Sequence, residues 1–216
     1  NQILNYNLNG WFLNGITSRI NVEPTSLLPE SDLFITDFSA QKLYRYDILA
    51  GTHYEICSFP EYPNGVFWDV QNGRLLVVCW GPDAPIYEVD VENGTYTTVI
   101  NTGLSNLDGI TMDDCGDFYV TAWSSNALHK YSSDFSETEI IATGLSNPAD
   151  ICYNSSNNII GVPNSGNNTV DFIEVDCDNV KIPEIQHNKS LTKTIDILGR
   201  ETTQKGLQLE IYDDGS

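Results

Sequence analysis

Short stretches in which apolar and polar residues alternate at every second position recur along most of this 216-residue chain. That period is typical of β-strands with one buried face. Residues 32–37 and 117–123 are clear examples. Turn pairs such as Asn72-Gly73 separate the stretches, and they favour tight turns between strands. Because no stretch keeps a helical period, the pattern predicts an all-β protein.

The alternating stretches belong to a repeat. The segment 102–110, TGLSNLDGI, returns 41 residues later as 143–151, TGLSNPADI. Short strand patterns lie between the two copies, so one unit stands between two copies of its own first strand. A period of this size with four short strands is typical of a β-propeller blade. Equivalent first-strand positions, at intervals of 50, 44 and 41, are Asn14, Asn64, Asp108 and Ala149.

We therefore expect about four four-stranded blades within residues 1–176. Six blades are usual for this type, so we expect a sequence truncated at its N-terminus that forms an open arc. Blades without neighbours would then expose apolar faces. Residues 177–190 are expected to be a polar linker, and residues 191–216 a short C-terminal β-hairpin.

Ten basic against thirty acidic residues give the chain a net charge of −20. This argues against nucleic acid as a partner, because phosphate needs a positive surface. No apolar run is long enough for a transmembrane segment. The five cysteines form no CxxC pair, although one disulfide is possible. The three histidines are scattered and do not indicate a histidine metal site.

In a propeller the first strand of each blade lines the central channel. Asn14, Asn64, Asp108 and Ala149 are therefore expected to converge there. Hard cations such as Ca²⁺ and Mg²⁺ prefer carboxylate and amide oxygens, which Asn and Asp supply. A competing interpretation is that Asn or Asp before Gly only forms a strand-entry turn. The polar side chain of Asp108 is absent from Ala149, and a purely structural position would not need that difference.

Residues 62–69 (YPNGVFWD) and 107–123 (LDGITMDDCGDFYVTAW) resemble two central blades of the senescence-marker protein/gluconolactonase/luciferin-regenerating enzyme family. The resemblance implies a six-bladed propeller with a divalent cation (Ca, Zn, Mg or Mn) and a small-molecule substrate in the channel, often a sugar lactone. It implies Asn64 and Asp108 as metal ligands, Asp108 also as catalytic general base, and Asn14 as a substrate-binding residue. The family's Glu ligand belongs to a first blade that this chain lacks, and Leu13 replaces an Asn that often contacts substrate.

NHL-repeat propellers have a similar sequence rhythm, and many of them bind ligands or proteins without catalysis. A metal-dependent lactonase and a non-catalytic binding propeller therefore both remain open. A structural adhesion module within a larger surface protein is a third interpretation.

The tail carries a second resemblance. Residues 196–201 (DILGRE) followed by 211–216 (IYDDGS) resemble the C-terminal sorting signal of the type IX secretion system. The basic ending usual in that family is missing, so the signal is expected to be incomplete. The resemblance implies the secretion machinery as a partner, and a secreted or cell-surface location.

Overall fold

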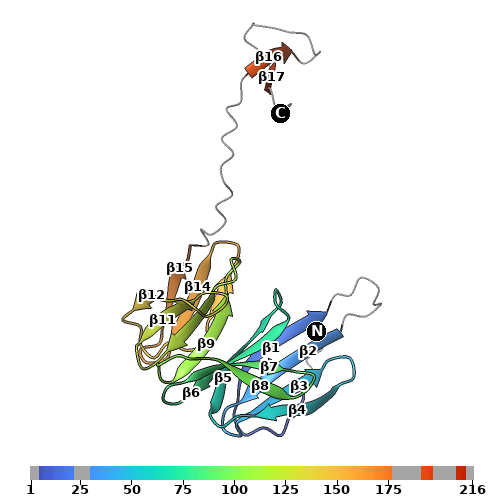
Figure 1. The fold of residues 1–216 in the computed structure, drawn as a ribbon, viewed down its shortest axis with the longest axis vertical. Helices are drawn as coiled ribbons and strands as arrows, with labels where there is room; N and C mark the ends of the chain where they lie inside the picture. The colour runs from blue at the N-terminus through green and yellow to red at the C-terminus, as the bar shows by residue number, and fades with distance from the viewer. Residues whose placement is uncertain (1–4, 22–29, 177–190, 197–207, 213–216) are drawn as a thin grey trace. The chain divides into compact units, whose positions relative to one another are not determined.

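The computed structural model describes residues 5–21, 30–176, 191–196 and 208–212, with side chains described for 5–19 and 31–176. Every regular element in these ranges is a β-strand. The chain divides into two compact units, residues 1–177 and 178–216. Three four-stranded sheets and one three-stranded sheet form the first unit, and a two-stranded sheet lies in the second (Figure 1). The all-β prediction is confirmed.

Each sheet of the first unit is an antiparallel meander whose strands follow chain order. Blade 1 contains β1 (Leu13–Asn21), β2 (Glu30–Asp37), β3 (Lys42–Asp47) and β4 (Thr52–Ser58). Blade 2 contains β5 (Tyr62–Asp69), β6 (Arg74–Trp80), β7 (Pro85–Asp90) and β8 (Thr95–Asn101). Blade 3 contains β9 (Leu107–Met112), β10 (Phe118–Ala122), β11 (Ala127–Tyr131) and β12 (Thr138–Thr143). Blade 4 contains β13 (Cys152–Asn154), β14 (Ile159–Asn164) and β15 (Thr169–Glu174). The predicted four strands are thus present in the first three blades, and blade 4 shows three among the described residues.

The blades stack because their sheets are apolar on both faces. The inner strands β1, β5, β9 and β13 contact one another in chain order. Alternate side chains of β6 enter different cores: Leu75 packs with Phe34 of blade 1, whereas Leu76 packs with Phe118 of blade 3. Tyr119 in turn packs with Ile160 of blade 4. A continuous apolar stack of this kind buries more surface than any blade could bury alone.

The inner-strand motif is a β-bulge. Leu13 of β1 pairs with Asp37 of β2, and Ile16 pairs with Ile35. Three residue positions along β1 therefore match two along β2. The same irregularity occurs in β5 and in β9. The glycines of the motif lie inside strands and do not have a positive φ. The motif pairs Asn14-Gly15, Asn64-Gly65 and Asp108-Gly109 are therefore not strand-entry turns, and that interpretation of the sequence is wrong.

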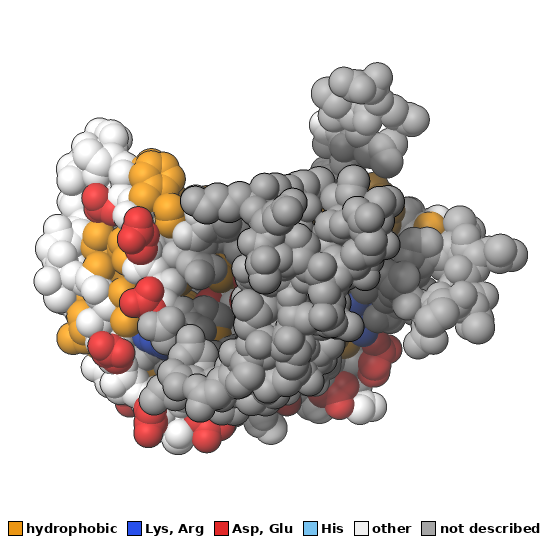
Figure 2. Space-filling view, turned by 90° about the horizontal axis from the view of Figure 1, so that it is seen from above, with side chains coloured by type: hydrophobic (Ala, Val, Ile, Leu, Met, Phe, Trp, Pro, Cys, Tyr) orange, Lys and Arg blue, Asp and Glu red, His pale blue; other side chains and the backbone are white. Residues whose placement is uncertain are grey.

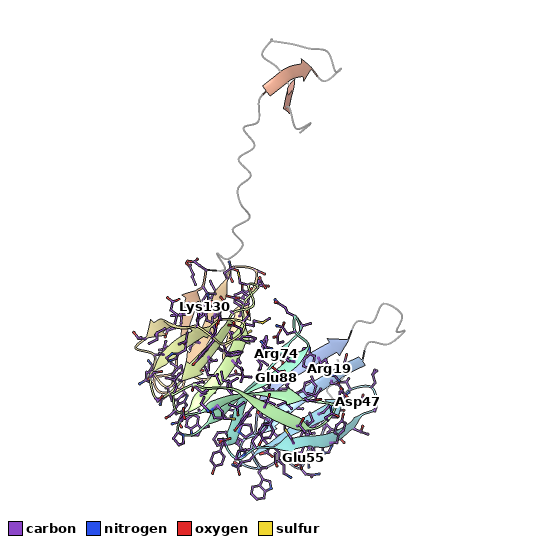
Figure 3. The ribbon with its side chains drawn as sticks, viewed as in Figure 1. Arg19, Asp47, Glu55, Arg74, Glu88 and Lys130 are labelled. Carbon is purple, nitrogen blue, oxygen red and sulfur yellow. The ribbon has the colours of Figure 1, made fainter. Side chains whose placement is uncertain are left out.

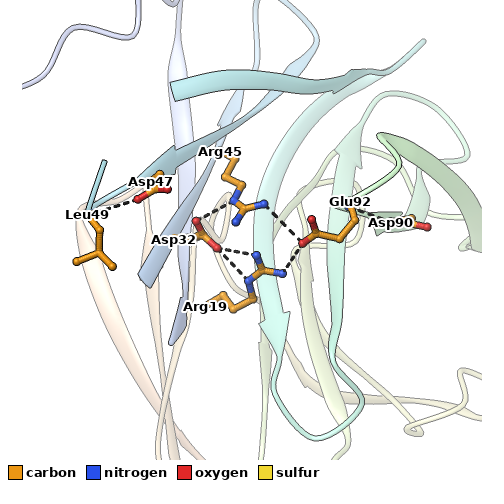
Figure 4. Close-up of polar contacts among 7 residues, drawn as sticks. All are labelled: Arg19, Asp32, Arg45, Asp47, Leu49, Asp90 and Glu92. Atoms are coloured by element: carbon orange, nitrogen blue, oxygen red, sulfur yellow. Dashed lines mark hydrogen bonds and ion pairs between the residues drawn. The ribbon is translucent and has the colours of Figure 1, made fainter. Parts of the chain in front are cut away.

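An ionic network joins blade 1 to blade 2 (Figure 4): its blade 1 members are largely buried, and its blade 2 member, Glu92, is exposed. Arg19 pairs with Asp32 at 2.6 Å and with Glu92 of blade 2 at 3.0 Å. Arg45 pairs with the same two carboxylates at 2.7 and 3.5 Å. The Arg19 guanidinium also lies 5.3 Å from the centre of the Trp68 ring, which belongs to blade 2.

Many acidic side chains shape turns. Asp47 and Asp90 accept backbone N–H groups of the two turns that follow them. Asp69 and Asp113 do the same after β5 and β9. Figure 2 shows acidic side chains spread over the visible described surface, and the charged residues labelled in Figure 3 come from three different blades. Part of the net charge of −20 is thus structural.

In the second unit β16 (Leu191–Asp196) pairs antiparallel with β17 (Gln208–Tyr212). The expected linker, residues 177–190, lies outside the described residues, as do residues 197–207 and 213–216 of the expected sorting signal. In the described part of the chain no helix is long and apolar enough to cross a membrane. Cys115 is disulfide-bonded, whereas Cys57, Cys79 and Cys152 are free.

Candidate functional site

The bulges bring predicted site residues from three blades together. Asn14 of β1 donates from Nδ2 to Oδ1 of Asn64 on β5. The Asn64 side chain is buried and donates from its own Nδ2 to the Leu107 carbonyl of β9, at 3.1 Å. Asp108 follows Leu107 directly, and its carboxyl group interacts with the Asn64 side chain. The structure thus places Asn14, Asn64 and Asp108 in one row along the inner strands.

Glycine allows the inner strands to approach this closely. A Cβ atom on Gly109 would lie 2.6 Å from the Ile151 nitrogen and 2.8 Å from the Asp150 Cα atom. A Cβ atom on Gly15 would lie 2.5 Å from the Asn64 carbonyl oxygen. Glycine in this motif therefore serves the contact between one backbone and the next.

Threonine hydroxyls fix two of these approaches. The Thr36 Oγ1 accepts the Gly15 N–H at 2.8 Å and donates to the Asn64 carbonyl at 2.6 Å. Thr121 repeats the arrangement two blades later, between blades 3 and 4, with the Gly109 N–H at 2.8 Å and the Ala149 carbonyl at 2.9 Å. Each hydroxyl therefore satisfies a bulge donor of its own blade and an acceptor of the next blade.

The Asp108 carboxyl group has an unusual environment. Burial raises its pKa most, repulsion from Asp150 raises it further, and the Trp123 indole and Asn64 amide oppose both, which leaves the value at about 6. The Trp123 Nε1 atom is itself buried and has no hydrogen-bond partner among the described residues. The Trp123 N–H therefore lies close enough to the Asp108 carboxyl group to lower its pKa, but without good hydrogen-bond geometry.

Sequence reasoning missed Asp150. Its blade carries Pro-Ala-Asp-Ile where blade 3 carries Leu-Asp-Gly-Ile, so Ala149 is the repeat-mate of Asp108 and Asp150 takes the place of Gly109. Burial raises the pKa of Asp150 while the Ile151 N–H, 3.0 Å away, opposes the shift, although by surface area the residue still reaches solvent. The available signal was an acidic residue one position after Ala149.

The donor set consists of oxygen atoms: two carboxylates and two amide groups. None of the ion pairs of the described residues involves Asp108 or Asp150. Oxygen donors fit Ca²⁺, Mg²⁺ or Mn²⁺ better than Zn²⁺, which prefers His and Cys. Within the described ranges no group of three or more His, Cys, Asp or Glu side chains could hold a metal. A cation here would thus need the Asn64 Oδ1 atom, which Asn14 would have to release.

A hydroxyl and an imidazole, those of Ser125 and His129, lie next to each other in blade 3. The Ser125 Oγ atom is 2.8 Å from Nε2 of His129, and burial lowers the pKa of that histidine. The pair spans the turn between β10 and β11, where a hydroxyl beside an imidazole stabilises the hairpin. The sequence did not indicate this contact.

Comparisons with known proteins place the fold. No protein-family model and no curated protein matches the chain. Among solved structures, a nidogen/laminin complex matches with a TM-score of 0.61 and 16% identity, over 76% of this chain and 72% of that one. The virginiamycin B lyase of Staphylococcus aureus matches with a TM-score of 0.52 and 19% identity, over 76% of this chain and 56% of the lyase. The same lyase, in a catalytically inactive form with quinupristin, matches with a TM-score of 0.51 and 18% identity. At these identities the likeness shows the fold alone, which is a β-propeller.

Proposed function

We propose that the inner-strand row holds a divalent cation, and that the protein is a metal-dependent hydrolase of lactones or related esters. One observation carries this proposal: the inner strands of blades 2 and 3 and the chain before β13 bring Asn64, Asp108 and Asp150 together without a basic partner among the described ion pairs. The resemblance of residues 62–69 and 107–123 to the senescence-marker protein/gluconolactonase/luciferin-regenerating enzyme family supports it.

The residues would divide the work by position. Asp108 and Asp150 would supply carboxylate oxygens and Asn64 its Oδ1 atom. When bound, a divalent cation polarises a carbonyl and lowers the pKa of water. The Asp108 carboxylate would take the proton of the attacking water, a role that suits a group with a pKa of about 6 near neutral pH. Asn14, exposed beside Asn64, would hydrogen-bond the substrate.

Calorimetry with Ca²⁺, Mg²⁺ and Mn²⁺ tests the cation. We expect saturable heat for the unmodified chain and at least a tenfold loss of affinity in Asp108→Asn and Asp150→Asn. Ser125→Ala is the matched control, because its hydroxyl lies elsewhere in blade 3. Hydrolysis of a panel of lactones with and without the cation then tests catalysis. Activity that survives both Asp108→Asn and chelation would rule out the mechanism.

A non-catalytic ligand-binding propeller is the second candidate, and one observation favours it. Both ends of the Asn64 amide are already engaged, by Asn14 and by the Leu107 carbonyl, as in a structural hydrogen-bond network. On this alternative no heat follows addition of cations. Replacing Asn64 by Asp would then destabilise the fold, because a carboxylate cannot donate to Leu107.

We also propose that the protein is exported, with residues 191–216 as its sorting signal. The resemblance of the tail to type IX signals supports this, and so does the disulfide at Cys115, because disulfides form in oxidising compartments. Deleting residues 191–216 in the native cells should retain the chain inside them. The chain's undiminished recovery at the surface or in the medium would contradict the proposal.

A further inference from the structure

Five aromatic side chains form a continuous row across one end of blades 1 to 3. They lie before β1, after β2, at the start of β5, at the end of β6 and after β10. We call the set the aromatic row, and its members are Phe12, Phe38, Tyr62, Trp80 and Trp123. Neighbouring ring centres are 5.8 Å apart for Phe12–Phe38, 5.1 Å for Phe38–Tyr62, 6.1 Å for Phe38–Trp80 and 4.8 Å for Trp80–Trp123.

Part of the row faces solvent. Phe12 is 53% exposed and Tyr62 is 45% exposed, while Phe38 and Trp80 are half-buried beneath them. Trp80 and Trp123 meet at an interplanar angle of 75°, so two indole rings form adjacent walls. Exposed aromatic surface that is contiguous over several blades is typical of a binding site.

The row has no cation of its own, in contrast to other aromatic rings of the molecule. Arg19 lies over Phe34 and Trp68, Arg45 over Tyr54, Arg74 over Phe118 and Phe135, and Lys130 over Tyr119. In the described part of the chain no Lys or Arg lies over a ring of the aromatic row. The negative faces of its rings therefore stay available to a cation from outside.

Negative charge near the aromatic row also favours a cationic ligand. Trp123, the inner end of the row, lies against the Asp108 carboxyl group, with Asp150 beyond it. The buried Nε1 atom of Trp123 has no hydrogen-bond partner among the described residues. A protein with a net charge of −20 disfavours anions on such a surface and attracts cations.

We infer that the aromatic row, together with the Asp108–Asp150 pair, binds a small organic cation: a molecule that carries a quaternary or primary ammonium group. The ammonium group lies over the rings of Tyr62 and Trp80. This goes beyond the proposed function, because the five rings are not metal ligands and binding of the organic cation needs no metal, although the site shares Asp108 and Asp150 with the proposed divalent-cation site.

Choline and its neutral isostere 3,3-dimethylbutan-1-ol test the inference in the full chain, in the presence of EDTA. Saturation-transfer NMR of the methyl protons reports binding of each probe. We expect choline to bind saturably and the isostere at least about fivefold more weakly, since only choline gains the cation–π and carboxylate attraction. Choline binding should also weaken as salt is added. Equal binding of the two probes, or no saturable choline signal, would overturn the inference.

Two variants locate the site. Tyr62→Leu should weaken choline about two- to fivefold, as expected for the loss of one exposed cation–π contact. Tyr54→Leu is the matched control, because Tyr54 is 46% exposed but lies in β4 under Arg45, and it should leave choline binding unchanged. An unchanged Tyr62→Leu variant would contradict the assignment. Because EDTA removes divalent cations, failure of the calorimetric metal test leaves this result intact, and the reverse also holds.

Discussion

At the scale of single residues, Asp69 shows how a carboxylate can stabilise this fold. Its side chain is fully buried and accepts hydrogen bonds from Arg74 Nε at 2.8 Å, from Asn72 Nδ2 at 2.8 Å and from two turn N–H groups. Burial alone would raise its pKa, but the hydrogen bonds from Arg74 and Asn72 lower the pKa below 3.8 on balance. The ionised form is therefore the one that the folded state prefers.

We predict that Asp69→Asn lowers the free energy of unfolding by about 1–3 kcal/mol at pH 7, because Arg74 loses its charged acceptor. A carboxyl group with a depressed folded pKa stabilises the protein above its unfolded pKa, and that contribution disappears as the pH falls through the folded value. The difference between variant and parent should therefore shrink below about pH 4. Urea unfolding across this pH range measures it.

Asp90→Asn is the control for Asp69. Asp90 shapes an equivalent turn on the surface, but its carboxylate accepts hydrogen bonds from Glu92 and Asn93 and forms no ion pair with an Arg among the described residues. Its substitution should change stability less than that of Asp69. An Asp69→Asn variant that is as stable as the Asp90→Asn variant at pH 7 would refute the prediction.

The residue scale also shows where sequence reasoning stops. The sequence repeat aligns Asn14, Asn64 and Asp108, because each stands directly before the glycine of the same motif. The structure does bring these three residues together. Asp150 could not be aligned in this way, because it stands in register with Gly109 and belongs to no column of polar residues. Its proximity to Asp108 follows from the packing of β9 against the chain before β13, which the one-dimensional repeat does not describe.

At the scale of elements, the inner-strand bulge is the feature that positions the site. Strand number, order and turns followed from period-two patterns and Asn-Gly pairs, and the first three blades match the prediction. The bulge was hidden, because Asn-Gly and Asp-Gly also occur in turns. Only the register of neighbouring strands shows that these glycines avoid a clash with the next backbone.

We predict that Gly109→Ala destabilises the protein by more than about 2 kcal/mol, since the new methyl group would meet the backbone of Asp150 and Ile151 and push the inner strands apart. Gly161→Ala is the matched control: it lies in β14, and its nearest atom would be a Phe172 ring carbon at 3.9 Å. That change should be neutral or stabilise by up to about 1 kcal/mol. Thermal and urea unfolding measure the stability of both variants. Equal stabilities would contradict the conclusion that Gly109 allows the inner strands to approach closely.

At the scale of the whole propeller unit, adjacent blades share cores, and what covers each inner strand is the preceding blade. The repeat-mates Ile16, Val66, Ile110 and Ile151 show this directly. The last three are 7%, 3% and 8% exposed, whereas Ile16 is 60% exposed. Ile16 instead lines a hollow of about 470 Å³ together with Leu13 and Tyr46.

Ion pairs also link the blades, and a substitution of Arg19 tests their contribution. Its guanidinium is buried, pairs with Asp32 of its own blade and Glu92 of blade 2, and lies over Trp68. We predict that Arg19→Met costs about 3 kcal/mol, the lower end of the range for breaking a buried ion pair, because Arg45 still pairs with Asp32. Urea unfolding measures the loss.

Lys42→Met is the control for Arg19, because Lys42 pairs with Glu55 on the surface within blade 1, and it should change stability much less than Arg19→Met. A double-mutant cycle with Glu92→Gln separates coupling between blades from the pair with Asp32. If Arg19 couples the blades, its variant should also broaden or split the unfolding transition, since a stack of repeats loses cooperativity when one interface weakens. A single sharp transition with the stability of the Lys42→Met variant would show that the apolar cores alone hold blades 1 and 2 together.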